Sequence, residues 1–132
     1  HKAIRRQRQM CIRDRSKIAL YRKCGCEIIY TKKKGNHIDL MNLMQCLGNM
    51  QIDSLLLEGG SAMNWSALEQ QIVDEVQIYI APKIFGGSAK SPVSGQGVAF
   101  PNDAIMLKPY AFSQVGNDYF IESEVIYPCL QE

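Results

Sequence analysis

Histidine and metal-ligand patterns are scarce in this sequence. Only His1 and His37 occur among its 132 residues, and neither stands in a ligand pattern. The five cysteines are an odd number, and their only close pair, Cys24 and Cys26, supplies too few ligands for a four-coordinate zinc site. We therefore expect no bound metal and interpret the cysteines as reduced thiols that act as small apolar residues.

Long apolar runs are absent as well. No stretch approaches the roughly 20 apolar residues of a membrane-spanning helix. The basic N-terminus lacks the apolar segment and the cleavage site of a signal peptide. We expect a cytoplasmic protein with no membrane partner. The composition, 46% hydrophobic and 21% charged, is typical of one globular domain.

Arginine is absent after Arg22, and the charges are divided along the chain. Residues 1–34 hold 12 basic and 2 acidic residues, whereas residues 35–132 hold 3 lysines and 11 acidic residues. The first 16 residues are open to three interpretations: a basic arm for nucleic acid, a solvated tail, or a remnant of adapter sequence, which the string MCIRDRS resembles. No aromatic residues are interleaved there for base stacking. We therefore predict a disordered or artefactual tail over residues 1–16, a folded domain over residues 17–132, and no nucleic-acid partner.

Turn residues divide the rest of the chain into alternating helices and strands. In chain order we expect a helix over 16–24 with Ser16 as N-cap, a strand over 25–31, a helix over 38–50, a buried strand between Asp53 and Gly59, a helix over 61–72, a strand over 73–82, a loop over 83–103, and two strands around Gly116–Asp118. Strands separated by helices predict a three-layer α/β/α fold with a mostly parallel sheet, closed by a C-terminal antiparallel hairpin. Three or four strands make a thin core, so we expect the N-terminal part of the domain to be missing.

The stretch SLLLEGGSAMNWSAL places two glycines between the expected buried strand and the helix that follows. Ligands of open α/β sheets gather at the carboxyl ends of strands. A helix N-terminus attracts phosphate, and glycine lets the phosphate approach the backbone. Gly59, Gly60, Ser61 and Ala62 are therefore a candidate phosphate cradle, in which Ser61 adds a hydroxyl or caps the helix. The alternative is a tight strand–helix turn, because the pattern matches neither the dinucleotide G-x-G-x-x-G nor the P-loop.

Glu58 ends the same apolar run. A carboxylate at the end of a buried strand is costly unless it is paired or hydrogen-bonded. It either accepts hydrogen bonds from the N–H or hydroxyl groups of a substrate or bonds nearby backbone N–H groups. The local pattern leaves both interpretations open.

Several motifs in one order resemble those of a known family. They are Glu58-Gly59-Gly60-Ser61, Ile72-Val73-Asp74-Glu75, Ile80-Ala81-Pro82, Gly86-Gly87 and the later GNDYFIES. Each motif alone is weak, but their combination over roughly residues 17–127 resembles the C-terminal part of the riboflavin-biosynthesis reductase domain, the RibD C-terminal family. That resemblance implies a dihydrofolate-reductase-like fold.

The resemblance also implies an activity. The family reduces a phosphoribosylamino-pyrimidinone with NADPH, which converts the ribose to a ribityl chain. Carried over by position, Gly59, Gly60, Ser61 and Ala62 become cofactor contacts and Glu58 a contact to a pyrimidine ribotide substrate. A strained or cis Gly59–Gly60 peptide is a further expectation from the fold family. No catalytic residue is assigned.

The sequence also departs from the family. The first strands, with their nucleotide- and substrate-binding residues, are not found, nor is the H-x-E with P-C-x-x-C of the deaminase domain often fused upstream. We therefore expect a reductase fragment that is inactive alone. Two alternatives stay open: another dihydrofolate-reductase-like oxidoreductase, and a non-catalytic assembly or nucleic-acid-binding module that uses the basic arm. The last hairpin also leaves a homodimer open, because exposed strand edges pair with partner chains.

Overall fold

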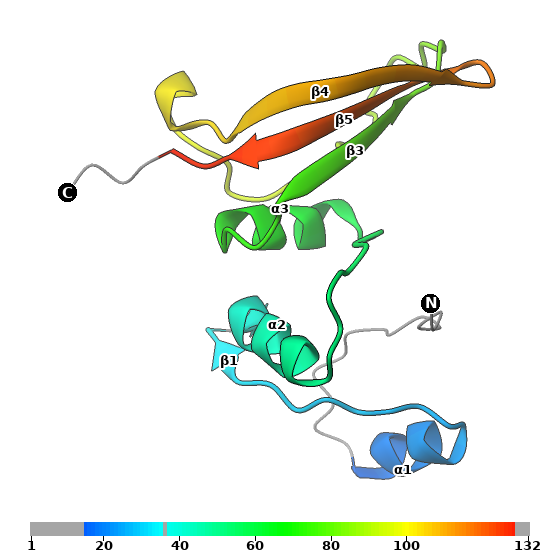
Figure 1. Ribbon diagram of the computed structural model, residues 1–132, viewed down its shortest axis with the longest axis vertical. Coiled ribbons are helices and arrows are strands. Elements are labelled where there is room, and N and C mark those ends of the chain that lie inside the picture. Colours follow the sequence, from blue (N-terminus) through cyan, green and yellow to red (C-terminus); the bar gives the residue numbers. More distant parts are fainter. Residues whose placement is uncertain (1–14, 36, 129–132) are drawn as a thin grey trace. The chain divides into compact units, whose positions relative to one another are not determined.

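The computed structural model describes residues 15–35 and 37–128 (Figure 1). The chain divides into two compact units, residues 1–54 and residues 55–132, and each is described by itself. Most of the predicted tail lies outside the described residues, so its assignment stays a prediction. Among the helices that the structure describes, none is long and apolar enough to span a membrane.

The first unit begins with helix α1, Arg15–Lys23. Because the helix starts at Arg15, Ser16 lies inside its first turn, and the predicted N-cap at Ser16 is wrong. The helix ends at a left-handed glycine, Gly25, with a φ of 76°. The N–H of Cys26 then donates to the carbonyl of Tyr21 at 2.9 Å, which satisfies one of the last free carbonyls of the helix.

A short hairpin follows, in which each strand has two residues: β1, Lys33–Lys34, pairs antiparallel with β2, His37–Ile38. The strand predicted over residues 25–31 is not formed, since residues 26–32 have no ladder partner among the described residues. Ile28 and Ile29 favour extended backbone. However, a strand exists only beside another strand, and local preference cannot supply the neighbour.

Helix α2, Leu40–Asn49, confirms the helix predicted over 38–50. Its N-cap is Asp39, whose side chain accepts a hydrogen bond from the N–H of Asn42 at 3.0 Å. This bond satisfies one of the unpaired donors of the first turn. The apolar stripe buries Leu40 and Leu47, each 5% exposed.

The buried strand predicted between Asp53 and Gly59 is wrong. Residues 52–60 have no regular secondary structure, and Leu55, Leu56 and Leu57 are 51%, 71% and 42% exposed. No strand in the described ranges pairs with residues 52–60. Without a neighbouring strand, the three leucines form no ladder hydrogen bonds, and their side chains stay exposed to solvent.

The described part of the second unit contains one α-helix and a three-stranded sheet (Figure 1). Its elements are α3, Ser61–Glu69, β3, Glu75–Ile80, β4, Met106–Val115, and β5, Asp118–Ile126. The strand order is β3-β5-β4, and both pairs are antiparallel. The helix at 61–72, the strand at 73–82 and the C-terminal hairpin are thereby confirmed, although the helix and strand are shorter than predicted.

The expected mostly parallel sheet and three-layer arrangement do not occur in the described residues. Every strand pair there is antiparallel. The parallel pairing was predicted to use residues 25–31, the leucine run after Asp53 and the strand at 73–82. The first two segments are unpaired, and β3 pairs antiparallel with β5. The sheet of the second unit therefore consists of the hairpin β4–β5, with β3 paired to the free edge of β5.

A two-way hydrogen bond connects the end of this sheet to the link between α3 and β3. The Tyr127 hydroxyl donates to the carbonyl of Val73 at 2.9 Å and accepts from the N–H of Val73 at 3.1 Å. Nearby, the N–H of Val125 donates to the carbonyl of Asp74 at 2.9 Å. These bonds fix where the chain enters β3 after the helix.

Residues 81–105 connect β3 to β4 with no regular element except a 3-10 turn, Pro101–Asp103. The prediction of an irregular loop over 83–103 is confirmed. Loops this long inside a compact unit are usually functional, and this one returns to α3.

Candidate functional site

The residues predicted to bind a ligand lie at the N-terminal end of α3. Glu58 precedes this end in an unpaired, exposed segment, so the prediction that a buried strand positions it is wrong. Among the described residues its carboxylate has no hydrogen-bond or ion-pair partner. The bond to nearby backbone N–H groups, the structural alternative for Glu58, is therefore not formed there, and the carboxylate is open to solvent.

Gly59 is the point at which the chain closes on the first turn of α3. A Cβ at this position would lie 3.1 Å from Cβ of Met63 and 3.2 Å from Oδ1 of Asn64, closer than ordinary contact. A glycine here therefore lets the backbone approach the helix. The described residues contain no cis peptide bond, so the expectation of a cis Gly59–Gly60 peptide is wrong.

Gly60 is the N-cap of α3, and nothing in the chain requires a glycine there. Its φ of −76° and ψ of 163° suit any residue, and a Cβ would meet no atom within 4 Å. Helix N-caps favour serine, threonine, aspartate or asparagine, whose side chains accept a bond from the first turn. Gly60 makes no such bond, so it leaves the helix end uncovered.

Backbone donors remain available at this uncovered end. The carbonyl of Gly60 accepts from the N–H groups of Met63 at 2.9 Å and Asn64 at 3.0 Å. For the N–H groups of Ser61 and Ala62 the described residues provide no acceptor. Unpaired N–H groups and the partial positive charge of a helix N-terminus together favour an anion.

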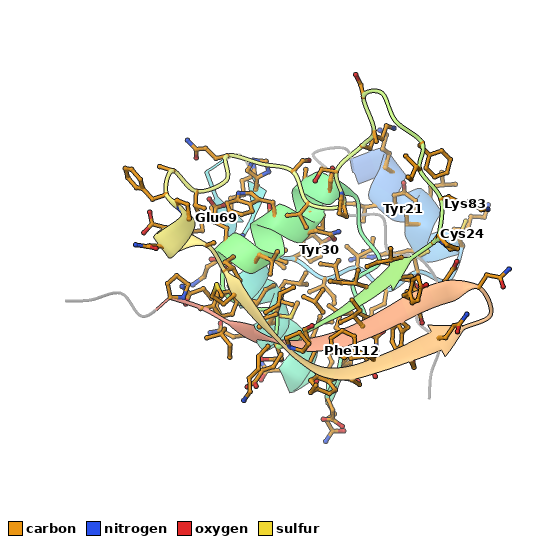
Figure 2. All side chains as sticks on the ribbon, turned by 90° about the horizontal axis from the view of Figure 1, so that it is seen from above. Tyr21, Cys24, Tyr30, Glu69, Lys83 and Phe112 are labelled. Carbon is orange, nitrogen blue, oxygen red and sulfur yellow. The ribbon has the colours of Figure 1, made fainter. Side chains whose placement is uncertain are left out.

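The negative end of the helix lies away from these donors. Glu69 is the last residue of α3 and occupies its far end (Figure 2). Nine residues at 1.5 Å each separate the two ends by about 12 Å. At that distance and exposure, solvent and salt screen most of the repulsion between the Glu69 carboxylate and an anion at Gly60.

A segment of the long loop, residues 91–95, docks on the first turns of α3. The N–H of Ser94 donates to the carbonyl of Ser61 at 3.1 Å, and the Ser94 hydroxyl donates to Oγ of Ser61 at 2.6 Å. The side-chain amide of Asn64 donates to the carbonyl of Pro92 at 2.9 Å. We call residues 91–95 the docked segment.

The docked segment was missed by sequence reasoning. Its only signal was the Gly-, Ser- and Pro-rich composition of residues 83–103, which indicates a loop but not what the loop contacts. Ser61, in contrast, was singled out from the sequence, and it is the first residue of α3; its role as a cofactor contact stays a prediction. Its hydroxyl accepts a bond from the loop and does not cap its own helix.

Sequence comparison agrees with this arrangement of motifs. The RibD C-terminal domain model matches residues 3–121. The riboflavin biosynthesis protein RibD of Actinobacillus pleuropneumoniae is 45% identical over 116 residues, which cover 87% of this chain and 31% of that protein. The 2,5-diamino-6-ribosylamino-4(3H)-pyrimidinone 5′-phosphate reductase of Methanothermobacter thermautotrophicus is 42% identical over 89 residues, which cover 67% of this chain and 41% of that protein.

Among solved structures, form 2 of RibD from Acinetobacter baumannii superposes with a TM-score of 0.61 and 23% identity, over 68% of this chain and 26% of that one. That likeness concerns the fold alone. The chain spans less than half the length of each of these relatives. The family match begins inside residues 1–16 and continues through α3, the docked segment and into β5. The chain belongs to the RibD C-terminal domain family.

Proposed function

We propose that this chain is part of a reductase of riboflavin biosynthesis, in which the N-terminal end of α3 binds the phosphates of NADPH. The substrate would be a 5-amino-6-(5-phosphoribosylamino)uracil-type ribotide, reduced to its ribitylamino form. Family membership supports this proposal, as does the reductase name of the Methanothermobacter relative. The observation that carries it is the open helix end at Gly60.

The residues at this end fit a phosphate group. Gly60 leaves space over the backbone, and the N–H groups of Ser61 and Ala62 are unpaired donors within the described ranges. The Ser61 hydroxyl lies 2.6 Å from the Ser94 hydroxyl, so it can donate to a phosphate while accepting from Ser94. These donors are neutral, so they would hold an anion by hydrogen bonds and the helix dipole.

The remaining roles follow from the chemistry of the side chains. The chemistry that NADPH supplies when bound is hydride transfer, and the protein contributes orientation and electrostatics. The exposed Glu58 carboxylate is an acceptor for the N–H or hydroxyl groups of a pyrimidine ribotide. It immediately precedes the proposed cradle, which brings the substrate contact close to the cofactor contact along the chain.

The test is a titration of the chain with NADPH, comparing Gly60→Asp with Gly60→Asn. Both side chains fit the open space at Gly60, and both are good N-caps, so neither variant should destabilise α3. They are nearly isosteric and differ in one negative charge. A carboxylate within a few ångströms of a phosphate should weaken binding at least tenfold beyond any effect of the asparagine.

Calorimetry gives the affinity, and far-UV circular dichroism confirms that each variant is folded. The proposal requires that the wild-type chain binds NADPH and that Gly60→Asp loses most of this affinity. A folded wild-type chain that does not bind NADPH, or equal affinities of the two variants, would contradict it.

A further inference from the structure

The docked segment holds one particular hydroxyl against the proposed phosphate site. Ser94 contacts Ser61 twice, through its backbone N–H at 3.1 Å and through its hydroxyl at 2.6 Å. The first bond fixes the loop backbone against the first residue of α3. The second fixes the Ser61 side chain, because an accepted hydrogen bond restricts the rotation of the hydroxyl.

Gly95 is the residue that allows this close approach. A Cβ built at Gly95 would overlap carbon atoms of the Trp65 indole ring. Trp65 lies in the second turn of α3, and a rigid ring has no flexible end that could move aside. Unlike Gly97, Gly95 has no left-handed φ, so its need for glycine comes from the contact with Trp65.

A third contact holds the other side of the docked segment. The Asn64 side-chain amide donates to the carbonyl of Pro92 at 2.9 Å. Ser61, Asn64 and Trp65 therefore all bind the same five residues of a loop that has no regular structure of its own. Holding irregular backbone at three points orders it, and here the order is imposed at the end of α3 that carries the free donors.

The pairing of the Ser94 and Ser61 hydroxyls at 2.6 Å has a chemical consequence. When Ser61 donates its proton to an anion, Ser94 can donate to Ser61 in turn. Hydroxyl groups in a chain polarise one another, which makes the terminal hydroxyl a stronger donor. An anion at the N-terminus of α3 would receive that proton together with the backbone N–H groups.

We propose that Ser94 is a positioning residue of the dinucleotide site, which acts on the cofactor phosphate through Ser61 and is held in place by the contact of Gly95 with Trp65. This inference rests on the proposed function. It assigns a role in cofactor binding to the docked segment, which begins more than 20 residues after the end of α3.

The experiment measures NADPH affinity by calorimetry and the emission of Trp65, the only tryptophan of the chain. Ser94→Ala keeps the backbone bond to Ser61, so Trp65 emission should not change, while NADPH affinity falls about threefold to tenfold. Ser94→Thr retains a hydroxyl and should restore the affinity. The matched control is Ser88→Ala, in an exposed part of the same loop, which should match the wild type.

Gly95→Ala tests the contact that holds the segment. The added methyl group must displace the loop or the indole, so both Trp65 emission and NADPH affinity should change. Gly48→Ala is its control, because a Cβ at Gly48 meets no atom within 4 Å. Unchanged Trp65 emission in Gly95→Ala would overturn the proposed docking.

The two proposals fail in different ways. If the wild type binds NADPH and Ser94→Ala binds it as tightly as Ser88→Ala, the role of Ser94 is refuted and the proposed function stands. If the folded wild type does not bind NADPH, the proposed function fails and the role of Ser94 fails with it. Lower affinity of Ser94→Ala with recovery in Ser94→Thr supports the inference, since a purely structural residue would also alter Trp65 emission.

Discussion

Replacing Tyr127 with phenylalanine removes both hydrogen bonds between the end of β5 and the link from α3 to β3. The hydroxyl donates to the Val73 carbonyl at 2.9 Å and accepts from the Val73 N–H at 3.1 Å. A net contribution of about 0.5–1.5 kcal/mol per hydrogen bond sets the scale. Val73 is only half-buried, so water replaces part of the loss. We expect the free energy of unfolding to fall by about 1–2 kcal/mol.

The assay is urea denaturation followed by far-UV circular dichroism. The midpoint should fall and the slope should stay the same, because the surface exposed on unfolding is unchanged. Tyr119→Phe is the matched control: its side chain is 57% exposed, and its hydroxyl has no hydrogen-bond partner among the described residues. Equal stabilities of Tyr127→Phe and Tyr119→Phe would refute the reasoning.

The same residue predicts a pH dependence. Burial raises the pKa of the Tyr127 hydroxyl, the hydrogen bond with backbone Val73 lowers it, and the charge of Asp74 raises it, with a net rise above the ordinary value of 10.0. A pKa raised in the folded state stabilises the fold below the unfolded pKa, and this contribution is lost as the pH rises through the folded pKa. The stability difference between wild type and Tyr127→Phe should therefore shrink above about pH 10.

Three further substitutions test the local structure by denaturation. Asp39→Ala removes the N-cap bond to Asn42 and should cost about 1 kcal/mol, whereas Asp39→Asn should cost much less. Ser123→Ala removes a buried hydroxyl, 1% exposed and unpartnered among the described residues, so stability should stay equal or rise; a loss above about 1 kcal/mol would reveal a partner. Gly59→Ala should destabilise α3 through its contact with Met63, while Gly60→Asn, a good N-cap in open space, should not; equal effects would contradict the described geometry.

The elements that the sequence predicted correctly are those whose causes are local. Helix α2 follows from an N-cap at Asp39 and an apolar stripe that includes Leu40 and Leu47. The C-terminal hairpin follows from Gly116, whose φ of 62° suits a two-residue turn between paired Val115 and Asp118. Such signals act within a few residues, so they can be read from the chain directly.

The candidate site residues remain a prediction; only their position in the local chain could be read from the sequence. Gly59, Gly60 and Ser61 precede a helix, and their proximity to its N-terminus is a property of the local chain. The expected setting of Glu58 at the end of a buried strand was wrong. Whether a run such as Leu55–Leu57 becomes a strand depends on a neighbouring strand, which local pattern does not contain.

By itself, the sequence determined the helices, the C-terminal hairpin and the family. Only the tertiary structure determined how the strands pair. Every strand pair in the described residues is antiparallel. The tertiary structure alone also brought Ser94 to Ser61 and Gly95 to Trp65. These contacts join residues about 30 positions apart through hydrogen bonds and steric fit, and an irregular loop has no periodicity from which they could be predicted.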